Sequence, residues 1–81
     1  MKATVIVTLK PTVLDPQGMP IHRSVQSMGL SDITDIRQGK YFVLTLDSAL
    51  DRANAEAEVQ RITRDVLTNP VIEEFTFRIE D

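Results

Sequence analysis

The 81-residue chain carries 9 basic and 12 acidic side chains, for a net charge of -3, and 42% of its residues are hydrophobic. A chain of this length has room for one hydrophobic core, so we expect a single domain over residues 1–81. The absence of cysteine excludes disulfides and thiolate metal sites, and the negative net charge disfavours binding to nucleic acid through its phosphates.

The first predicted element is a strand over residues 3–9, where β-branched and apolar residues alternate with period two. A helix is expected to begin shortly afterwards, because Asp15 can cap its first free amides and Pro16 suits its first position. Gly29 is expected to end this helix in the left-handed conformation. The apolar stripe of the helix consists of Ile21, Val25 and Met28.

A β-hairpin is expected next, formed by a strand over residues 32–38 and a strand over residues 41–46. Gly39 lies between them and can take positive φ, which suits a tight turn. A second helix follows, and Asn69-Pro70 ends it before a last strand over residues 71–79. The apolar stripe of the second helix consists of Ala55, Val59, Ile62 and Val66.

This order of elements predicts a ferredoxin-like α+β sandwich, β-α-β-β-α-β, with a four-stranded antiparallel sheet. Right-handed crossovers place both helices on one face of that sheet. The other face is too apolar for plain solvation and too polar for a core, so we expect dimerisation by sheet packing or edge pairing. An open face with ordinary threonine-rich exposure is the alternative. The uncovered face is expected to collect Ile6, Thr8 and several of Tyr41, Val43, Thr45, Ile72 and Thr76.

The sequence offers no set of residues for catalysis or metal binding. His22 is the single histidine, so neither a zinc site of the usual composition nor a Cys-His pair can form. Glu73 and Glu74 point to opposite faces of a strand, and helix capping explains Asp47 and Asp51 better than a magnesium site does. The glycines are scattered and form no phosphate-binding loop. We therefore expect no catalytic residue, no metal and no cofactor in this chain.

Residues 37–43 partly match the aromatic third strand of an RNA-recognition motif. Tyr41 and Phe42 alternate faces, and the first strand has no aromatic residue, so we expect no nucleic-acid partner. No apolar run reaches the roughly 18 residues of a membrane span, and the first residues lack the apolar core of a signal peptide. We expect a cytoplasmic protein without a membrane partner.

Three segments follow one another along the chain: Lys10 with Leu14-Asp15-Pro16-Gln17-Gly18, Arg37 with Gly39-Lys40, and Asn69-Pro70-Val71-Ile72-Glu73. In this order they resemble the PurS family, the small subunits of phosphoribosylformylglycinamidine synthase. The resemblance runs nearly from end to end. It departs from the family at Pro20-Ile21-His22-Arg23, where members more often have an alanine-rich helix.

The resemblance implies a homodimeric or homotetrameric subunit that joins a glutaminase subunit to an ATP-dependent synthetase subunit in purine biosynthesis. The assembled complex would form formylglycinamidine ribonucleotide from glutamine, ATP and formylglycinamide ribonucleotide, with ammonia passed internally. ATP and magnesium would belong to the synthetase subunit. An ACT-like dimer that binds an amino acid near Gly18 is the alternative function. Contacts with partner subunits are expected at Lys10, Asp15, Gln17, Arg37 and Lys40, which lie in turns.

Overall fold

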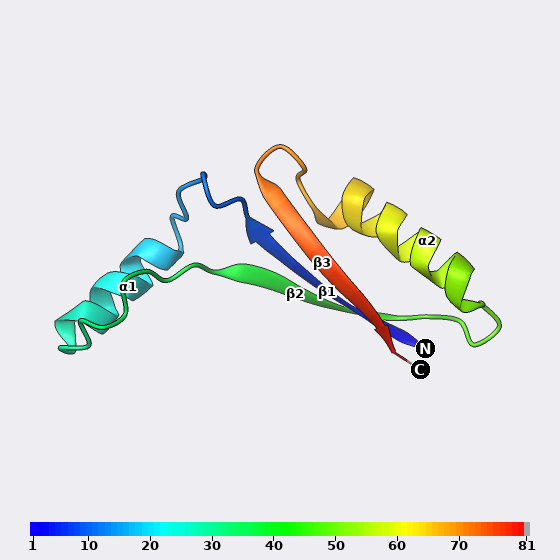
Figure 1. Cartoon of the computed structure of the whole chain (residues 1–81), viewed down its shortest axis with the longest axis horizontal. Coiled ribbons are helices and arrows are strands. Elements are labelled where there is room, and N and C mark those ends of the chain that lie inside the picture. The colour runs from blue at the N-terminus through cyan, green and yellow to red at the C-terminus, as the bar shows by residue number, and fades with distance from the viewer. Residues whose placement is uncertain (81) are drawn as a thin grey trace.

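The computed structural model describes residues 1–80 and shows a three-stranded antiparallel sheet, one helix packed on it and one helix projecting beyond its end (Figure 1). The strands run in the order β2-β1-β3 across the sheet. A π-helical turn continues α2 over Thr63–Leu67. The elements are β1 (Lys2–Leu9), α1 (Gly18–Ser27), β2 (Gly39–Thr45), α2 (Arg52–Ile62) and β3 (Glu73–Glu80).

The core lies between the sheet and α2. The alternation predicted for the first strand is confirmed, because Ala3, Val5 and Val7 of β1 are fully buried on the side of the sheet that faces α2. Ala55 and Val59 of α2 are fully buried against them. Since β1 is the central strand, the register brings aromatic and aliphatic residues of both neighbours alongside it. These are Phe42 and Leu44 of β2 and Phe75, Phe77 and Ile79 of β3.

Helix α2 begins where the capping signals predict. The Asp51 carboxylate accepts a hydrogen bond from the backbone N–H of Asn54 at 2.8 Å, as an N-cap does. Asp47 accepts one from the N–H of Ala49 at 2.9 Å in the preceding turn. Both carboxylates therefore have the structural roles that the sequence favoured for them.

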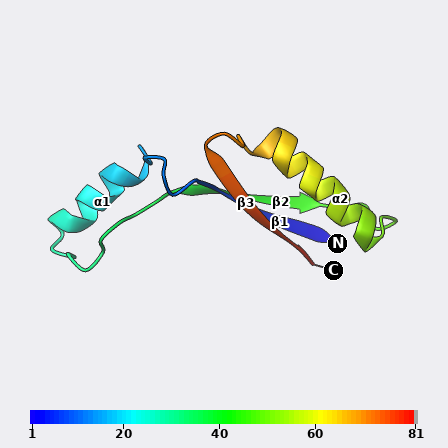
Figure 2. The same ribbon diagram turned by 45° about the horizontal axis from the view of Figure 1, so that its top comes forward.

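The expected hairpin over residues 32–46 is wrong for this chain, and the sheet formed by residues 1–80 has three strands instead of four. Residues 33–38 are extended but pair with no strand among residues 1–80, and they run on from the start of β2 towards α1 (Figure 2). Gly39 does not form a turn, because it already pairs with Thr8 of β1. A Cβ at Gly39 would lie 2.6 Å from the backbone oxygen of Val7, so the glycine permits close approach of two strands.

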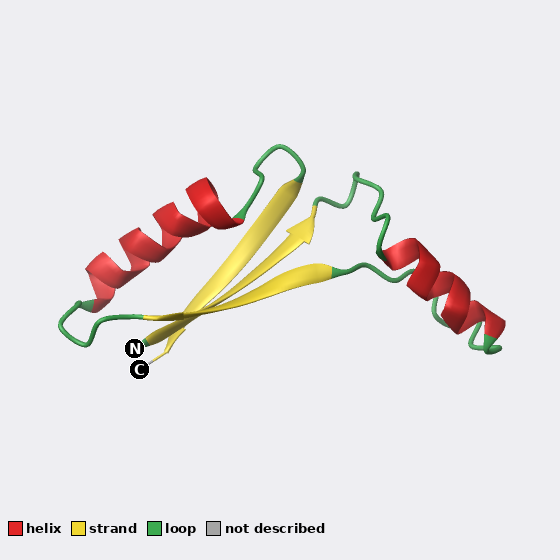
Figure 3. Ribbon diagram, turned by 180° about the vertical axis from the view of Figure 1, so that it is seen from behind, coloured by secondary structure: helices red, strands yellow, loops and turns green. Residues whose placement is uncertain are grey.

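The expectation that both helices cover one face of the sheet is also wrong. Within residues 1–80, α2 is the one helix that lies on the sheet, whereas α1 projects beyond the end of the sheet that is far from the chain termini (Figure 3). The reason is the unbroken course of residues 33–45, which carries α1 away from the sheet instead of folding back over it. Gly29 does end α1 in the left-handed conformation, with φ of 87°. We call α1 together with residues 33–38 the arm.

Candidate functional site

Asp15 ties the turn after β1 to the segment that precedes β2. Its side chain is almost fully buried, with 5% of the residue exposed. One carboxylate oxygen accepts hydrogen bonds from the backbone N–H groups of Gln17 and Gly18, both at 3.0 Å. The other oxygen accepts a hydrogen bond from the N–H of Gln38. Asp15 thus bonds the free N–H of Gly18 at the start of α1, as predicted, but the N-cap is Gln17 and Pro16 does not occupy the first helical position. The same side chain also fixes where the arm leaves the sheet.

These contacts make the charged form of Asp15 the favoured one. The N–H of Gln38 is the largest influence that lowers the pKa of Asp15, and the N–H groups of Gly18 and Gln17 and the charge of Arg37 lower this pKa further. Desolvation acts in the opposite direction and does not reverse the shift. The pKa of Asp15 therefore lies below its ordinary value of 3.8.

A lowered pKa in the folded state makes the stability depend on pH in a defined direction. The contribution of the Asp15 carboxylate to the free energy of unfolding is fully present above its unfolded-state pKa. This contribution is lost as the pH falls from about 4 through the lower folded-state pKa. We expect Asp15→Asn to reduce the urea midpoint at pH 7 and to shrink the difference between the midpoints at pH 7 and pH 3. Asp32→Asn, at an exposed carboxylate beyond the end of α1, is the matched control and should keep the wild-type difference. An unchanged difference in Asp15→Asn would contradict the assignment.

Arg37 and Lys40 also have partners within the chain. The Arg37 guanidinium donates hydrogen bonds to the backbone oxygens of Lys10, at 3.1 Å, and of Val13. The Lys40 ammonium lies 3.4 Å from the Glu73 carboxylate, and both Arg37 and Lys40 remain largely exposed. Arg37 thus connects the segment before β2 to the loop after β1. Lys40 connects β2 to β3.

The structure brings the five expected contact residues together at one end of the sheet. Asp15, Gln17 and Lys40 line a groove of about 600 Å³, and Arg37 joins Lys10 to this cluster through its hydrogen bond. Asp15 is buried, and Arg37 and Lys40 have partners within the chain, so these three side chains also have local structural roles. Partner contact at these five positions stays a prediction.

Two contacts inside the arm are not predicted by any pattern in the sequence. The Nε2 atom of His22 lies 2.7 Å from the backbone oxygen of Ile33, so the single histidine joins α1 to the extended segment beside it. Gly18 packs directly on the backbone of Ile36, where any larger residue would overlap the carbonyl oxygen. Neither contact has a local sequence signal, because each joins residues that are far apart in the chain.

The uncovered face of the sheet is where the alternation predicts it. Ile6 lies between Tyr41 and Thr76 in the register, and Val43 follows on the same face of β2. Ile6, Tyr41 and Val43 are 46%, 66% and 53% exposed. We call this surface the open face; its other members include Thr8, Thr45, Glu74 and Arg78.

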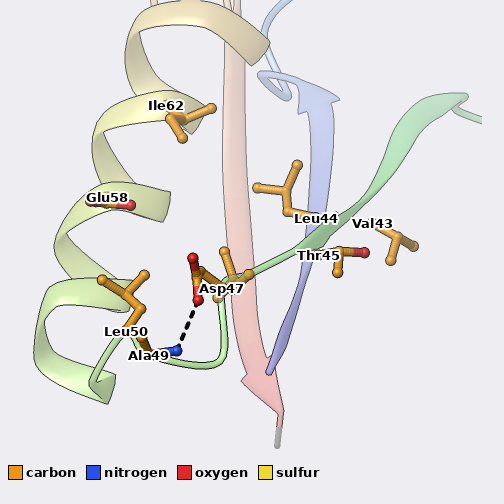
Figure 4. A pocket seen from close by; sticks show the side chains of 9 residues that line it. Val43, Leu44, Thr45, Asp47, Ala49, Leu50, Glu58 and Ile62 are labelled. Atoms are coloured by element: carbon orange, nitrogen blue, oxygen red, sulfur yellow. Dashed lines mark hydrogen bonds between the residues drawn. The ribbon is translucent and has the colours of Figure 1, made fainter.

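A second groove lies on the helix side of the sheet, between β2 and α2. Leu44 projects from β2 and Ile62 from α2 on opposite sides of it, and Leu50 closes one end (Figure 4). Leu46 and Ala49 add further apolar surface, and Asp47 and Glu58 are polar members of the lining. We call it the α2 groove.

The described residues 1–80 contain no cluster of three or more histidine, aspartate or glutamate side chains placed to hold a metal ion. Over the same residues, no helix combines the length and apolar character needed to cross a bilayer. The features that stand out are therefore surfaces: the open face, the α2 groove and the polar cluster around Asp15.

Comparison with known proteins gives consistent matches over nearly the whole chain. Residues 2–81 match the family model described as "PurS: Phosphoribosylformylglycinamidine (FGAM) synthase". The PurS subunit of phosphoribosylformylglycinamidine synthase from Synechocystis sp. is 39% identical over 75 residues, which cover 93% of this chain and 74% of the relative. The corresponding subunit from Bacillus subtilis is 36% identical over 80 residues, which cover 99% of this chain and 93% of the relative.

Solved structures agree with the sequence matches. The C2 crystal form of B. subtilis PurS superposes with a TM-score of 0.84 at 36% identity, covering 99% of this chain and 98% of the other. PurS of Methanocaldococcus jannaschii superposes with a TM-score of 0.85 at 29% identity, covering 99% of this chain and 95% of the other. That protein is described as a subunit of formylglycinamide ribonucleotide amidotransferase in the purine biosynthetic pathway. A chain of PurLQS from Thermotoga maritima superposes with a TM-score of 0.84 at 27% identity, covering 95% of this chain and 93% of the other.

Proposed function

Because the chain belongs to the PurS family of phosphoribosylformylglycinamidine synthase subunits, we propose that it joins the glutaminase and ATP-dependent synthetase subunits of that enzyme in purine biosynthesis. The match over residues 2–81 carries this conclusion, since it includes every element that the structure describes. The similarity to a chain of PurLQS supports a bridging role. The subunit has no catalytic task of its own and supports the transfer of ammonia from glutaminase to synthetase.

The chemistry of the chain is in keeping with this division of labour. Glutamine hydrolysis needs an activated nucleophile and ATP-dependent ligation needs bound cations, whereas this chain has no cysteine and a single histidine. We assign ATP and magnesium to the synthetase subunit. We further propose that the protein works in the cytoplasm as a homodimer or homotetramer.

Two surfaces are assigned to assembly. The open face supplies exposed apolar area next to threonines, which suits the moderately polar contacts of a subunit interface. The polar cluster at Lys10, Gln17, Arg37 and Lys40 lies at the end of the same sheet and would give the contact its specificity. We propose that the open face packs against another subunit of the complex.

Reconstitution of the three subunits tests the proposal. Glutaminase and synthetase subunits are mixed with and without this chain, and formation of formylglycinamidine ribonucleotide is followed with either glutamine or ammonium chloride as the nitrogen source. We expect glutamine-dependent synthesis to fall to background without this chain, because ammonia is then not delivered to the synthetase. Ammonium-dependent synthesis should persist and shows that the synthetase is active. Equal glutamine-dependent rates with and without the chain would refute the bridging role.

A further inference from the structure

The groove of about 600 Å³ beside Asp15 lies where the loop after β1 meets the loop before β3, at one end of the sheet (Figure 1). The backbone N–H of Lys10, in the first of these loops, donates a hydrogen bond to the oxygen of Ile72, in the second, at 2.8 Å. This bond holds two walls of the groove together. Its volume lies in the range of protein sites that take up a ligand. We call it the Asp15 groove.

Apolar side chains surround the mouth of the Asp15 groove. Leu14 and Val71 are 79% and 78% exposed, so neither belongs to the core. Leu14 lines the groove, and Val71 directly precedes Ile72, which also lines it. Leu9 of β1 adds to the apolar lining. Large apolar side chains that stay exposed around a concave site are typical of an interaction surface.

The two carboxylates in the lining are already bonded within the chain. Asp15 accepts hydrogen bonds from three backbone N–H groups. Glu73, whose side chain is 11% exposed, accepts a hydrogen bond from the N–H of Asn69 at 2.7 Å through one oxygen. Its other oxygen pairs with Lys40. A cation that entered the groove would therefore have to compete with these internal partners.

The basic side chains around the groove, by contrast, keep donors for a ligand. Within residues 1–80, no ion pair involves the Lys10 ammonium. The Lys40 side chain is 57% exposed and has N–H groups beyond the one directed at Glu73. Arg37 is exposed and uses one of its nitrogens, Nη2, for its bonds within the chain. Three cations thus outnumber two carboxylates in this cluster, on a chain whose net charge is -3.

The same internal bonds give the Asp15 groove its shape before anything binds. Arg37 holds the backbone of Lys10 and Val13, and the Asp15 carboxylate holds the N–H of Gln38. The loop after β1 is therefore fixed to the segment before β2. A site formed in advance loses little conformational entropy when it binds a partner.

We propose that the Asp15 groove binds an acidic segment of a partner subunit of the synthase, with an apolar side chain of that segment in the groove and an adjacent carboxylate on the cations at its rim. The free donors of Lys10, Arg37 and Lys40 favour the carboxylate. The exposed Leu14 and Val71 favour the apolar anchor, because contact with it removes their surface from water. This inference rests on the bridging function proposed above and specifies the chemistry by which a partner is recognised.

Zero-length cross-linking tests the ionic contact. The assembled subunits are treated with a water-soluble carbodiimide, which joins a lysine amine to a carboxylate in contact with it, and the linked peptides are identified by mass spectrometry. We expect Lys10 or Lys40 to be joined to an aspartate or glutamate of the glutaminase or synthetase subunit. The pair Lys40–Glu73, 3.4 Å apart within the chain, is the internal control for the reaction. Links from both lysines only to carboxylates of this chain or of a second copy would refute the proposal.

Lys10→Glu and Leu14→Ser supply a second readout. Neither side chain is buried, and the bonds of Lys10 described above are made by its backbone, so we expect both variants to fold. In calorimetric titrations with the partner subunits, Lys10→Glu is expected to raise the dissociation constant at least about tenfold at low salt and less at high salt. Leu14→Ser is expected to raise it at least about fivefold at both salt concentrations. Arg61→Glu, at an 81% exposed side chain of α2, is the matched control and should bind like the wild type.

The outcomes separate this inference from the proposed function. If the wild-type chain binds its partners and restores glutamine-dependent synthesis while Lys10→Glu and Leu14→Ser bind equally well, the Asp15 groove is not the contact and the bridging function stands. A wild-type chain that binds neither partner would refute both. Weakening by Lys10→Glu that is the same at low and high salt would refute recognition of a carboxylate. A change in the mass of the isolated chain in Lys10→Glu, measured by light scattering, would assign the groove to a second copy and refute the proposal.

Discussion

Replacing Gly18 with alanine is expected to separate α1 from residues 33–38 and to lower the free energy of unfolding by about 1–3 kcal/mol. A Cβ at this position would overlap the carbonyl oxygen of Ile36 and lie 3.1 Å from the Asp15 carboxylate. The obstacle is backbone, which cannot rotate aside as a flexible side chain does. Shifting Ile36 would also displace the N–H of Gln38, which donates a hydrogen bond to the Asp15 carboxylate. The substitution therefore strains the packing and weakens the hydrogen bonds that hold the arm.

Urea unfolding followed by circular dichroism measures this loss. Gly29→Asn is the matched control, because Gly29 lies at the other end of α1 and a Cβ there would meet nothing within 4 Å. Gly29 has a φ of 87°, and asparagine tolerates the left-handed conformation, so we expect a loss below about 1 kcal/mol. Equal losses in the two variants would show that the cost at position 18 comes from the helix itself and not from contact with Ile36.

Elements with strong local signals could be predicted from the sequence. The alternation of Val5 and Val7 with Ile6 fixed both the first strand and the side of the sheet that faces the helix. The capping carboxylate of Asp51 and the spacing of Ala55 and Val59 did the same for α2. In each case the residues that specify the element lie within one strand or a few helical turns, so no distant contact was needed.

The course of the chain at Gly39 could not be predicted in this way. A glycine between two apolar stretches is compatible with a tight turn, and it is equally compatible with a strand that passes close to a neighbouring backbone. The choice depends on Asp15, which lies 23 residues before Gln38, and on the bond from Arg37 to Lys10, 27 residues away. Contacts at such separations leave no periodic trace in the sequence.

In the candidate site, too, contacts between neighbouring residues could be predicted from the sequence and contacts between distant residues could not. Asp15 carries a recognisable capping signal, and its bonds to Gln17 and Gly18 follow from it. Its third bond, to Gln38, and the role of His22 depend on how the arm folds against itself. Lys10, Asp15, Gln17, Arg37 and Lys40 are predicted from the sequence as turn residues that contact partners, whereas only the geometry shows that they gather at one end of the sheet and that three of them also hold the chain together.

Val43→Glu is expected to weaken the binding of the partner subunits by at least about tenfold without unfolding the chain. Val43 is 53% exposed on the open face, so the folded protomer can keep the new carboxylate in water. If the open face packs against another subunit, the same carboxylate must lose its water in the complex. Removing a charge from water in an interface is costly, and the loss therefore falls on assembly and not on folding.

Co-elution and calorimetric titration with the partner subunits measure this effect, and circular dichroism checks the fold. Val66→Glu makes the same chemical change at a residue that is 74% exposed in the turn after α2, on the helix side of the sheet. We expect Val66→Glu to bind like the wild type, because that residue lies outside the open face. Equal weakening by both variants would indicate a general effect of added charge. Normal binding of Val43→Glu would show that this part of the open face stays solvated in the complex, and the interface would then have to lie on the polar cluster around Lys10 and Gln17.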